Sequence, residues 1–130
     1  TKAIELRNGE TPLSSLMHAF SCYRRGLSKD ALKDPQGAIE DFTKAINILP
    51  TYTDAYYKRG ISKYDLKNYA GALLDFSKSI DIGAENGNAY YNRGFTKYFL
   101  DDPKGACQDW NKAKELGHEK AQELINKFCK

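Results

Sequence analysis

Small and aromatic residues recur at fixed positions along the chain, with a period of 34 residues. Gly26, Gly60 and Gly94 share one register, since 60 − 26 = 34 and 94 − 60 = 34. The stretch DAYYKRGISKY at 54–64 returns as NAYYNRGFTKY at 88–98. A period of this length, with small residues interleaved among rings, is typical of two antiparallel helices that pack closely in each unit.

The second half of each unit keeps the same period. When the shared glycine is numbered position 8, the units begin at 19, 53 and 87. Each unit then has alanine at position 20 and a ring at position 24, which gives Ala38, Ala72 and Ala106 followed by Phe42, Phe76 and Trp110. Small residues let two helices approach, and the ring fills the space between neighbouring pairs.

Helix boundaries repeat as well. Position 16 holds Asp34, Asn68 and Asp102, which are good N-cap residues, and Pro35 and Pro103 follow two of them at the first helical position. The second helix of each unit is therefore predicted to begin there. Pro50, Gly83 and Gly117 are predicted to end these helices.

This arrangement of aromatic, Gly and Ala positions over residues 19–120 resembles the tetratricopeptide repeat. The resemblance implies an all-α fold, a right-handed solenoid of antiparallel helix pairs. It also implies one domain over 1–130, with repeats at 19–52, 53–86 and 87–120. Residues 119–130 place Ala121, Leu124, Ile125 and Phe128 on one helix face, as expected of a capping helix.

The N-terminal segment 1–18 departs from the repeat. TKAIEL at 1–6 is similar to TKAINI at 43–48, the second helix of the first repeat. This segment does not continue the 34-residue register, because eight extra residues separate it from the first repeat, which begins at residue 19. Thr11 and Pro12 make a plausible cap and first helical position, so the first helix is predicted to be about two turns longer than its equivalents.

Composition narrows the class of protein. A formal net charge of +3 is too mild to indicate nucleic-acid binding, and 41% hydrophobic with 28% charged residues indicates a soluble globular chain. No apolar run approaches the length of a membrane span. Cys22, Cys107 and Cys129 lack paired spacing, which favours ordinary buried thiols in a reducing compartment and a cytoplasmic location.

Catalytic and metal-binding patterns are missing from the sequence. His18 and His118 lie near opposite ends, outside any metal-ligand spacing, so surface roles are predicted for both. No nucleophile motif or phosphate-binding glycine loop occurs. The glycines are periodic, and helix packing explains them. We therefore expect a non-enzymatic protein with no cofactor and no bound metal.

Charged residues repeat with the same period. Position 7 holds Arg25, Arg59 and Arg93, and position 23 holds Asp41, Asp75 and Asp109. Ion pairing within each repeat is favoured over an arginine row that binds an anionic ligand. The lysines at positions 11 and 26 lack a repeated partner and are predicted to lie on solvated faces: Lys29, Lys63, Lys97, Lys44, Lys78 and Lys112.

The candidate binding site follows from the resemblance, since this family lines its concave groove with the first helix of each repeat. The groove residues are Tyr23, Leu27, Asp54, Tyr57, Ile61, Tyr64, Asp65, Asn88, Tyr91, Phe95 and Tyr98. Such a tyrosine row predicts binding of a protein or peptide segment. For any single ring, packing against neighbouring helices remains an equal alternative.

The carboxylate clamp that captures acidic chaperone C-termini in this family is not matched. Its positions hold Tyr23, Leu27, Lys58, Asn88 and Asn92, rather than the clamp's pattern of basic residues and asparagines. Asp54 and Asp65 favour a partner of apolar and basic character. Self-association, or membership of a longer array, is the alternative function. RNA binding ranks third, because the groove carries acids.

Overall fold

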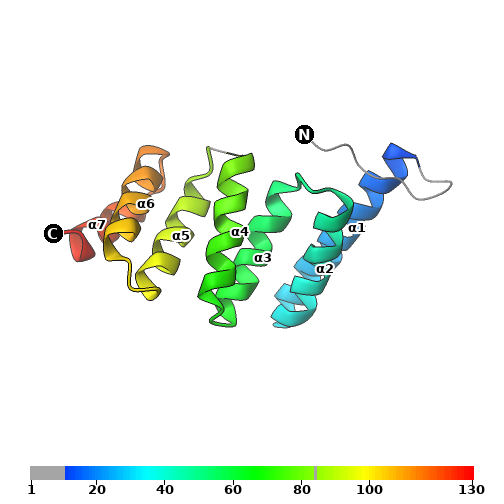
Figure 1. Ribbon diagram of the computed structural model, residues 1–130, viewed down its shortest axis with the longest axis horizontal. Helices are drawn as coiled ribbons and strands as arrows, with labels where there is room; N and C mark the ends of the chain where they lie inside the picture. Colours follow the sequence, from blue (N-terminus) through cyan, green and yellow to red (C-terminus); the bar gives the residue numbers. More distant parts are fainter. Residues whose placement is uncertain (1–10, 84) are drawn as a thin grey trace.

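The computed structural model describes residues 11–83 and 85–130, which form an all-α solenoid. Figure 1 shows the helices in a row, from α1 at one end to α7 at the other. In chain order they are α1 (Pro12–Ala31), α2 (Pro35–Ile48), α3 (Thr53–Asp65), α4 (Tyr69–Ile82), α5 (Gly87–Phe99), α6 (Pro103–Glu115) and α7 (Ala121–Phe128).

The first helix is lengthened as predicted. α1 has 20 residues, whereas α3 and α5 have 13 each. Thr11 caps it, because the Thr11 side chain accepts a hydrogen bond from the Ser14 amide and the Ser14 hydroxyl side chain accepts one from the Thr11 amide. The predicted similarity of residues 1–6 to a second helix falls outside the described residues.

The predicted caps of the second helices are confirmed. The side chains of Asp34, Asn68 and Asp102 each accept a hydrogen bond from the amide three residues later. The repeat boundaries at 19–52, 53–86 and 87–120 remain a prediction, although each of these ranges contains two helices that pack against each other.

The turn inside each helix pair contains a residue that sequence analysis overlooked. Lys33, Lys67 and Asp101 have φ angles of 61°, 62° and 61°, the left-handed region that glycine adopts most easily. All three occupy position 15, directly before the N-cap of the second helix. Each side chain there costs roughly 1 kcal/mol of backbone strain. The turn geometry is therefore fixed by the helices on either side rather than by its own residue.

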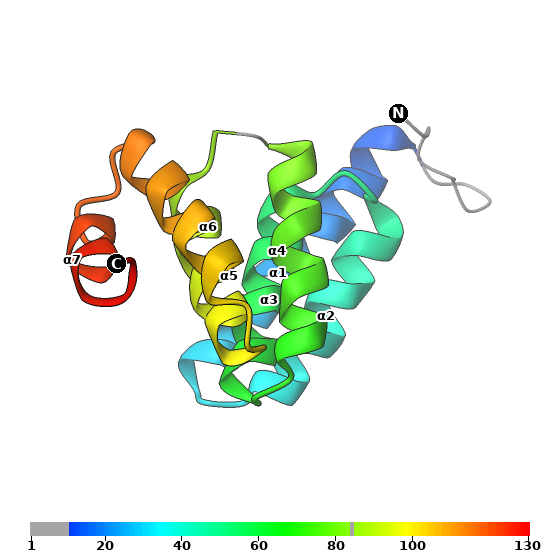
Figure 2. The ribbon, with the colours of Figure 1, turned by 60° about the vertical axis from the view of Figure 1, so that its left-hand side comes forward.

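The pairs stack so that α2 lies between α1 and α3, and α4 lies between α3 and α5. The first helices also contact one another, α1 with α3 and α3 with α5. They therefore form the inner layer of the solenoid, with α2, α4 and α6 outside. Figure 2, turned from the first view, shows α6 and α4 in front of α5 and α3.

Glycines at position 8 allow rings to reach the helix backbone. A Cβ atom on Gly60 would lie 2.8 Å from the Phe76 ring, and one on Gly94 would lie 2.4 Å from Trp110 Nε1. Phe42, Phe76 and Trp110 are fully buried. The prediction that these glycines serve close packing is confirmed, and the three rings form the centre of the core.

A buried carboxylate joins the two helices of each pair. Arg59 donates to Asp75 through Nε at 2.8 Å and Nη2 at 2.7 Å, and Arg93 binds Asp109 in the same way at 2.8 Å for both nitrogens. Arg25 donates to Asp41 through the same nitrogens, at 3.0 and 2.8 Å. The predicted pairing within each repeat is thus confirmed.

The expectation that the lysines at position 11 lie on solvated faces is wrong. The Nζ atoms of Lys29, Lys63 and Lys97 lie 3.0, 3.1 and 3.1 Å from Asp41, Asp75 and Asp109 Oδ2. Position 11 is one turn after position 7, so both cations point towards the same carboxylate. Sequence analysis allotted each aspartate one partner, whereas a carboxylate has acceptor sites for two cations.

The pKa of Asp41 reflects the same balance. Burial raises the pKa of this carboxyl group, but hydrogen bonds and charges from Arg25 and Lys29 outweigh burial and hold the pKa below its ordinary value. The group is therefore ionised at neutral pH. Arg25 in turn has its pKa raised, first by its hydrogen bond to Asp41.

The arginines of the second and third pairs also reach backwards to the preceding pair. Arg59 Nη1 donates to Thr43 Oγ1 at 3.2 Å, and Arg93 Nη1 donates to Ser77 Oγ at 3.3 Å. Arg25 makes no such bond to any described residue. Its side chain is 55% exposed, against 17% for Arg59 and Arg93. The buried ion network therefore links successive pairs as well as the helices within one pair.

The expectation of three ordinary thiols is also wrong. Cys107 and Cys129 form a disulfide, with Cα atoms 5.8 Å apart, and only Cys22 is a free, buried thiol among the described residues. Their separation of 22 residues shows no recognisable spacing. The fold brings them together because α7 turns back along α6. The argument for a reducing compartment, which rested on unpaired cysteines, loses its basis.

The C-terminal helix behaves as predicted. α7 packs on α6, with Ala121 buried and Leu124, Ile125 and Phe128 half-buried. Its opposite face is exposed to solvent. None of the described helices combines the length and apolar character that a membrane span requires.

Replacing Gly60 by leucine tests the close approach of α3 to Phe76. We expect a loss of roughly 1 to 3 kcal/mol in the free energy of unfolding, because the new side chain overlaps the ring despite its better helix propensity. Chemical denaturation measures the loss. Ala70→Leu, which changes an exposed site on α4, is the control. Equal stability of Gly60→Leu and Ala70→Leu would contradict the packing.

Candidate functional site

The predicted groove residues lie on the inner helices α1, α3 and α5, and most of them are half-buried. Position 5 of each pair contributes a tyrosine, and position 9 contributes an apolar residue: Tyr23, Tyr57 and Tyr91 with Leu27, Ile61 and Phe95. We describe these six residues as the inner ring row. The surroundings of the three tyrosines differ.

Tyr23 packs against rings from two other elements. Its ring centroid lies 4.9 Å from Tyr52, which precedes α3, and 5.7 Å from Phe42 on α2. Burial, followed by the charge of Asp54, raises the pKa of Tyr23 to about 12. Its hydroxyl therefore keeps its proton at neutral pH and can donate a hydrogen bond.

Tyr57 connects two inner helices. Its ring lies 5.8 Å from that of Phe76, and its hydroxyl accepts a hydrogen bond of 2.8 Å from Asn92 Nδ2 on α5. Asn92 Nδ2 also donates to the Asn88 carbonyl oxygen at 3.0 Å. Burial raises the pKa of Tyr57, so the phenol proton remains available to a ligand. Sequence analysis treated Asn92 only as a mismatch to the clamp and missed this bond.

Tyr91 is covered from the C-terminal side. His118, in the loop between α6 and α7, stacks on its ring at a centroid distance of 3.9 Å, and Phe95 meets it edge-on at 5.1 Å. The predicted surface role of His118 is therefore wrong: it is half-buried, and its Nδ1 atom is buried without a hydrogen-bond partner. Its place in the loop, three residues after the end of α6, gave no signal in the sequence.

An aromatic cluster joins the second helix pair, α3 and α4, to α5 of the third pair. Tyr64 contacts Tyr69 at 5.4 Å and Phe99 at 6.1 Å, while Tyr69 and Phe99 stack at 5.1 Å. Tyr98 packs on Phe128 of α7 at 5.0 Å. Tyr64 and Tyr98 therefore contribute to packing between helices, and Phe99 remains 50% exposed.

The predicted acids lie at the margins of this surface. Asp54 and Asp65 are both exposed, and Asp65 shares a hollow of about 460 Å³ with Asp30, Lys33 and Pro35. Burial, and then the charge of Asp30, raises the pKa of Asp65, while Lys33 acts in the opposite direction. Two neighbouring carboxylates favour a cationic group nearby.

A polar hollow lies at the C-terminal end of the inner ring row. It encloses about 490 Å³ and is lined by Asn88, Tyr91 and Asn92 from α5 and by residues 117–120 from the following loop. Asn88 is exposed there. The hollow offers amide, imidazole, carboxylate and ammonium groups within one space. Residues 11–83 and 85–130 contain no cluster of three side chains suited to a metal ion.

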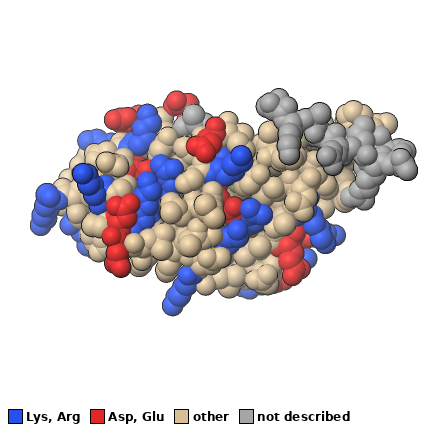
Figure 3. All heavy atoms as spheres, viewed as in Figure 1, with Lys and Arg blue, Asp and Glu red and all other residues tan. Residues whose placement is uncertain are grey.

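The face shown in Figure 3 carries Lys and Arg interspersed with Asp and Glu, rather than a field of one sign. A nucleic-acid interface usually gathers its basic residues on one face. The face in this view therefore has no continuous basic surface that could bind phosphate groups.

Comparisons with known proteins agree with the fold and the repeat. Residues 21–52 match the family model of the tetratricopeptide repeat. The second TPR domain of human RPAP3, solved with the HSP70 peptide SGPTIEEVD, is similar with a TM-score of 0.84 and 24% identity, over 89% of this chain and 98% of that one. No curated protein matches the chain significantly.

Two further solved domains share the architecture. The first TPR of Spaghetti (RPAP3), bound to the HSP90 peptide SRMEEVD, has a TM-score of 0.83 and 21% identity, covering 86% of this chain and 90% of that chain. The Arabidopsis OM64 TPR domain gives 0.81 and 22%, with 87% and 98% covered. Residues 21–52 thus match a tetratricopeptide repeat, and the chain shares its fold with these TPR domains.

Proposed function

We propose that the chain is a non-catalytic interaction module that binds a segment of a partner protein along the inner ring row. The observation that carries this proposal is that α1, α3 and α5 each contribute a tyrosine and an apolar residue to the inner layer, with further rings on α1 and α5 exposed. Phe20 on α1 is 48% exposed, and Phe99 on α5 is 50% exposed. Large apolar side chains left open to solvent mark interaction surfaces.

Polar groups along the row suit a peptide main chain. The hydroxyl of Tyr57 has a proton to donate, and the Asn92 side-chain oxygen is free to accept, because the bonds of this pair use Asn92 Nδ2. Inner helices about 10 Å apart would meet an extended chain every third residue, since such a chain rises about 3.3 Å per residue. A partner with apolar side chains at that spacing fits best.

Charge distinguishes this groove from those of the similar domains. Two of those domains are solved with peptides that end in EEVD. Here the equivalent inner positions carry Tyr23, Leu27 and Asn88, and Asp54 and Asp65 lie at the groove margins. An acidic peptide end would be repelled, so we propose a partner with apolar and basic residues.

Tyr57→Ala tests the inner ring row. The probe is a peptide selected from a random library on the wild-type protein, and its affinity is measured by fluorescence polarisation. We expect at least tenfold weaker binding, about 1.4 kcal/mol, because Tyr57 occupies the centre of the row. Lys78→Ala, which changes an exposed residue on α4, should leave the affinity unchanged.

Equal losses in the two variants would place the binding surface elsewhere. Tyr57→Phe separates the hydroxyl from the ring, because it keeps the contact with Phe76 and removes only the bond to Asn92. Circular dichroism of each variant confirms that the helices remain.

A second candidate function is self-association through the face of α1 that points away from the following helix pairs. Ser21 and Ser28 are exposed, whereas the equivalent residues of α3 and α5 are fully buried against the preceding pair: Ala55, Ser62, Ala89 and Thr96. Within residues 11–83 and 85–130, Arg25 also has no hydroxyl partner of the kind that Arg59 and Arg93 bind. Another helix would complete this face.

Sedimentation equilibrium over a range of concentrations tests self-association. We expect a mass above that of one chain at high concentration, and a single chain for Ser21→Arg, because the larger charged side chain would block close approach of a helix. A wild-type protein that stays a single chain at every concentration would exclude this function.

A further inference from the structure

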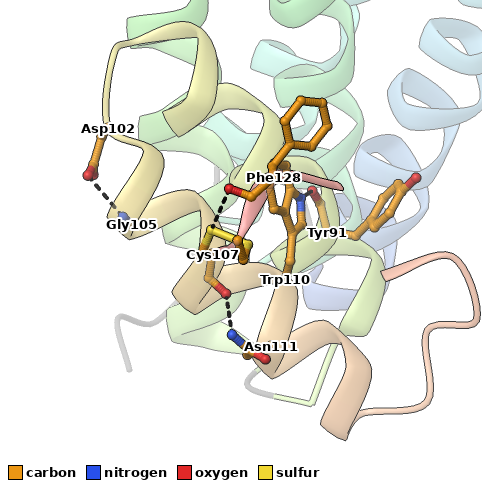
Figure 4. Close-up of a disulfide and its surroundings, with 8 residues drawn as sticks. Tyr91, Asp102, Gly105, Cys107, Trp110, Asn111 and Phe128 are labelled. Atoms are coloured by element: carbon orange, nitrogen blue, oxygen red, sulfur yellow. Dashed lines mark hydrogen bonds between the residues drawn. A yellow bond between two sulfur atoms is a disulfide. The ribbon is translucent and has the colours of Figure 1, made fainter. Parts of the chain in front are cut away.

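The disulfide ties the C-terminal helix to the body of the solenoid. Cys107 lies on α6, and Cys129 directly follows the last residue of α7. Figure 4 shows Cys107 with Trp110 and Phe128 beside it. The Sγ atom of Cys107 lies 3.9 Å from the carbonyl oxygen of Phe128. The bond therefore holds the end of α7 against α6.

Besides the disulfide, α7 is held by the packing of one face on α6. It has eight residues, it packs against α6, and no side chain caps its N-terminus. Ala121 is its one buried residue, and Phe128 supplies ring contacts to Tyr98 and Trp110 at 5.0 and 5.8 Å. A helix of this length is only marginally stable by itself in water. Its position on α6 therefore depends strongly on the covalent bond.

The disulfide borders a space open to solvent, since both of its cysteines are partly exposed. Cys107 and Cys129 line an open hollow of about 460 Å³ together with Gln108, Lys104 and Lys130. Cys22, in contrast, is 3% exposed inside the core. The two lysines carry positive charge beside the disulfide, which attracts an incoming thiolate. The site thus combines access with favourable electrostatics.

We propose that the Cys107–Cys129 bond is a thiol–disulfide exchange site for a dithiol reductant, and that its reduction releases α7 from α6. One thiolate of the reductant attacks a cysteine sulfur, forms a mixed disulfide and expels the other cysteine as a thiolate. The second thiol of the reductant then displaces the remaining cysteine and closes a disulfide within the reductant. Two electrons pass to the protein, and each cysteine takes up one proton.

Release of α7 would uncover the buried tryptophan. Trp110 is the sole tryptophan of the chain, and its side chain is fully buried. Phe128 of α7 covers one part of the indole, while Phe95 and Tyr98 on α5 cover other parts. Loss of Phe128 opens a path for small solutes to the indole. Trp110 fluorescence therefore reports the position of α7 without any ligand.

The experiment treats the folded chain with dithiothreitol, a dithiol, and follows free thiols and acrylamide quenching of Trp110. We expect two thiols to appear without loss of helical circular dichroism, and the quenching constant to rise at least about twofold as the last helix opens locally. A bond that is reduced only when the whole chain unfolds would overturn the exchange site. Unchanged quenching in the reduced, folded protein would overturn the release of α7.

Matched variants separate the disulfide from other effects of reductant. Cys22→Ser keeps the disulfide and should respond like the wild type. Cys107→Ser combined with Cys129→Ser should show the raised quenching without reductant, and quenching at the oxidised wild-type level would refute the release. If the double variant fails to fold, the reduced wild type still decides the question.

Lys104→Gln combined with Lys130→Gln tests the electrostatic part. Reduction by dithiothreitol should slow about threefold, because an exposed positive charge changes the local thiolate concentration only modestly. An unchanged rate would overturn the proposed role of the two lysines.

Discussion

A buried carboxylate that forms ion pairs with two cations organises each helix pair, and the rest of the solenoid depends on it. Asp41, Asp75 and Asp109 lie on the second helices, and each receives an arginine and a lysine from the first helix of its own pair. A buried carboxylate without these partners would be strongly destabilising. The two helices are therefore held in one register, which places the glycine at position 8 against the ring at position 24.

The same network sets the relation between successive pairs. Since Arg59 and Arg93 also donate to Thr43 and Ser77 of the preceding pair, a shift of one pair against the next would break bonds at a buried centre. This constraint keeps the inner helices evenly spaced. The inner ring row, and with it the proposed binding of an extended segment, follows from that spacing. Arg25, whose backward position is open, marks the end of the network among the described residues.

The periodic part of the structure could be predicted from sequence, because caps, packing glycines and ion pairs act between residues at fixed separations. Asp34, Arg59 and Gly60 are examples. Features that depend on the C-terminal departure from the repeat could not be predicted. The Cys107–Cys129 bond and the stack of His118 on Tyr91 arise where the chain turns from α6 into α7. The lysines at position 11 also repeat, but the aspartate at position 23 of each repeat had been assigned to the arginine at position 7 alone.

The groove itself was predicted only in outline. Its positions follow from the family pattern, yet the contacts of each ring depend on residues from other helices, such as Tyr52 beside Tyr23 and Asn92 beside Tyr57. These partners occupy different positions in different pairs, so the period of 34 residues gives no indication of them. The tyrosines consequently serve both packing and an open surface.

A double-mutant cycle between Arg59 and Asp75 tests the organising role of the carboxylate most directly. The free energies of unfolding of Arg59→Gln, Asp75→Asn and the double variant are compared with that of the wild type. We predict a coupling energy of about 1 to 3 kcal/mol, because Arg59→Gln leaves the buried Asp75 with Lys63 as its one cation, and Asp75→Asn leaves Arg59 without its counter-charge. A coupling energy indistinguishable from zero would contradict the account.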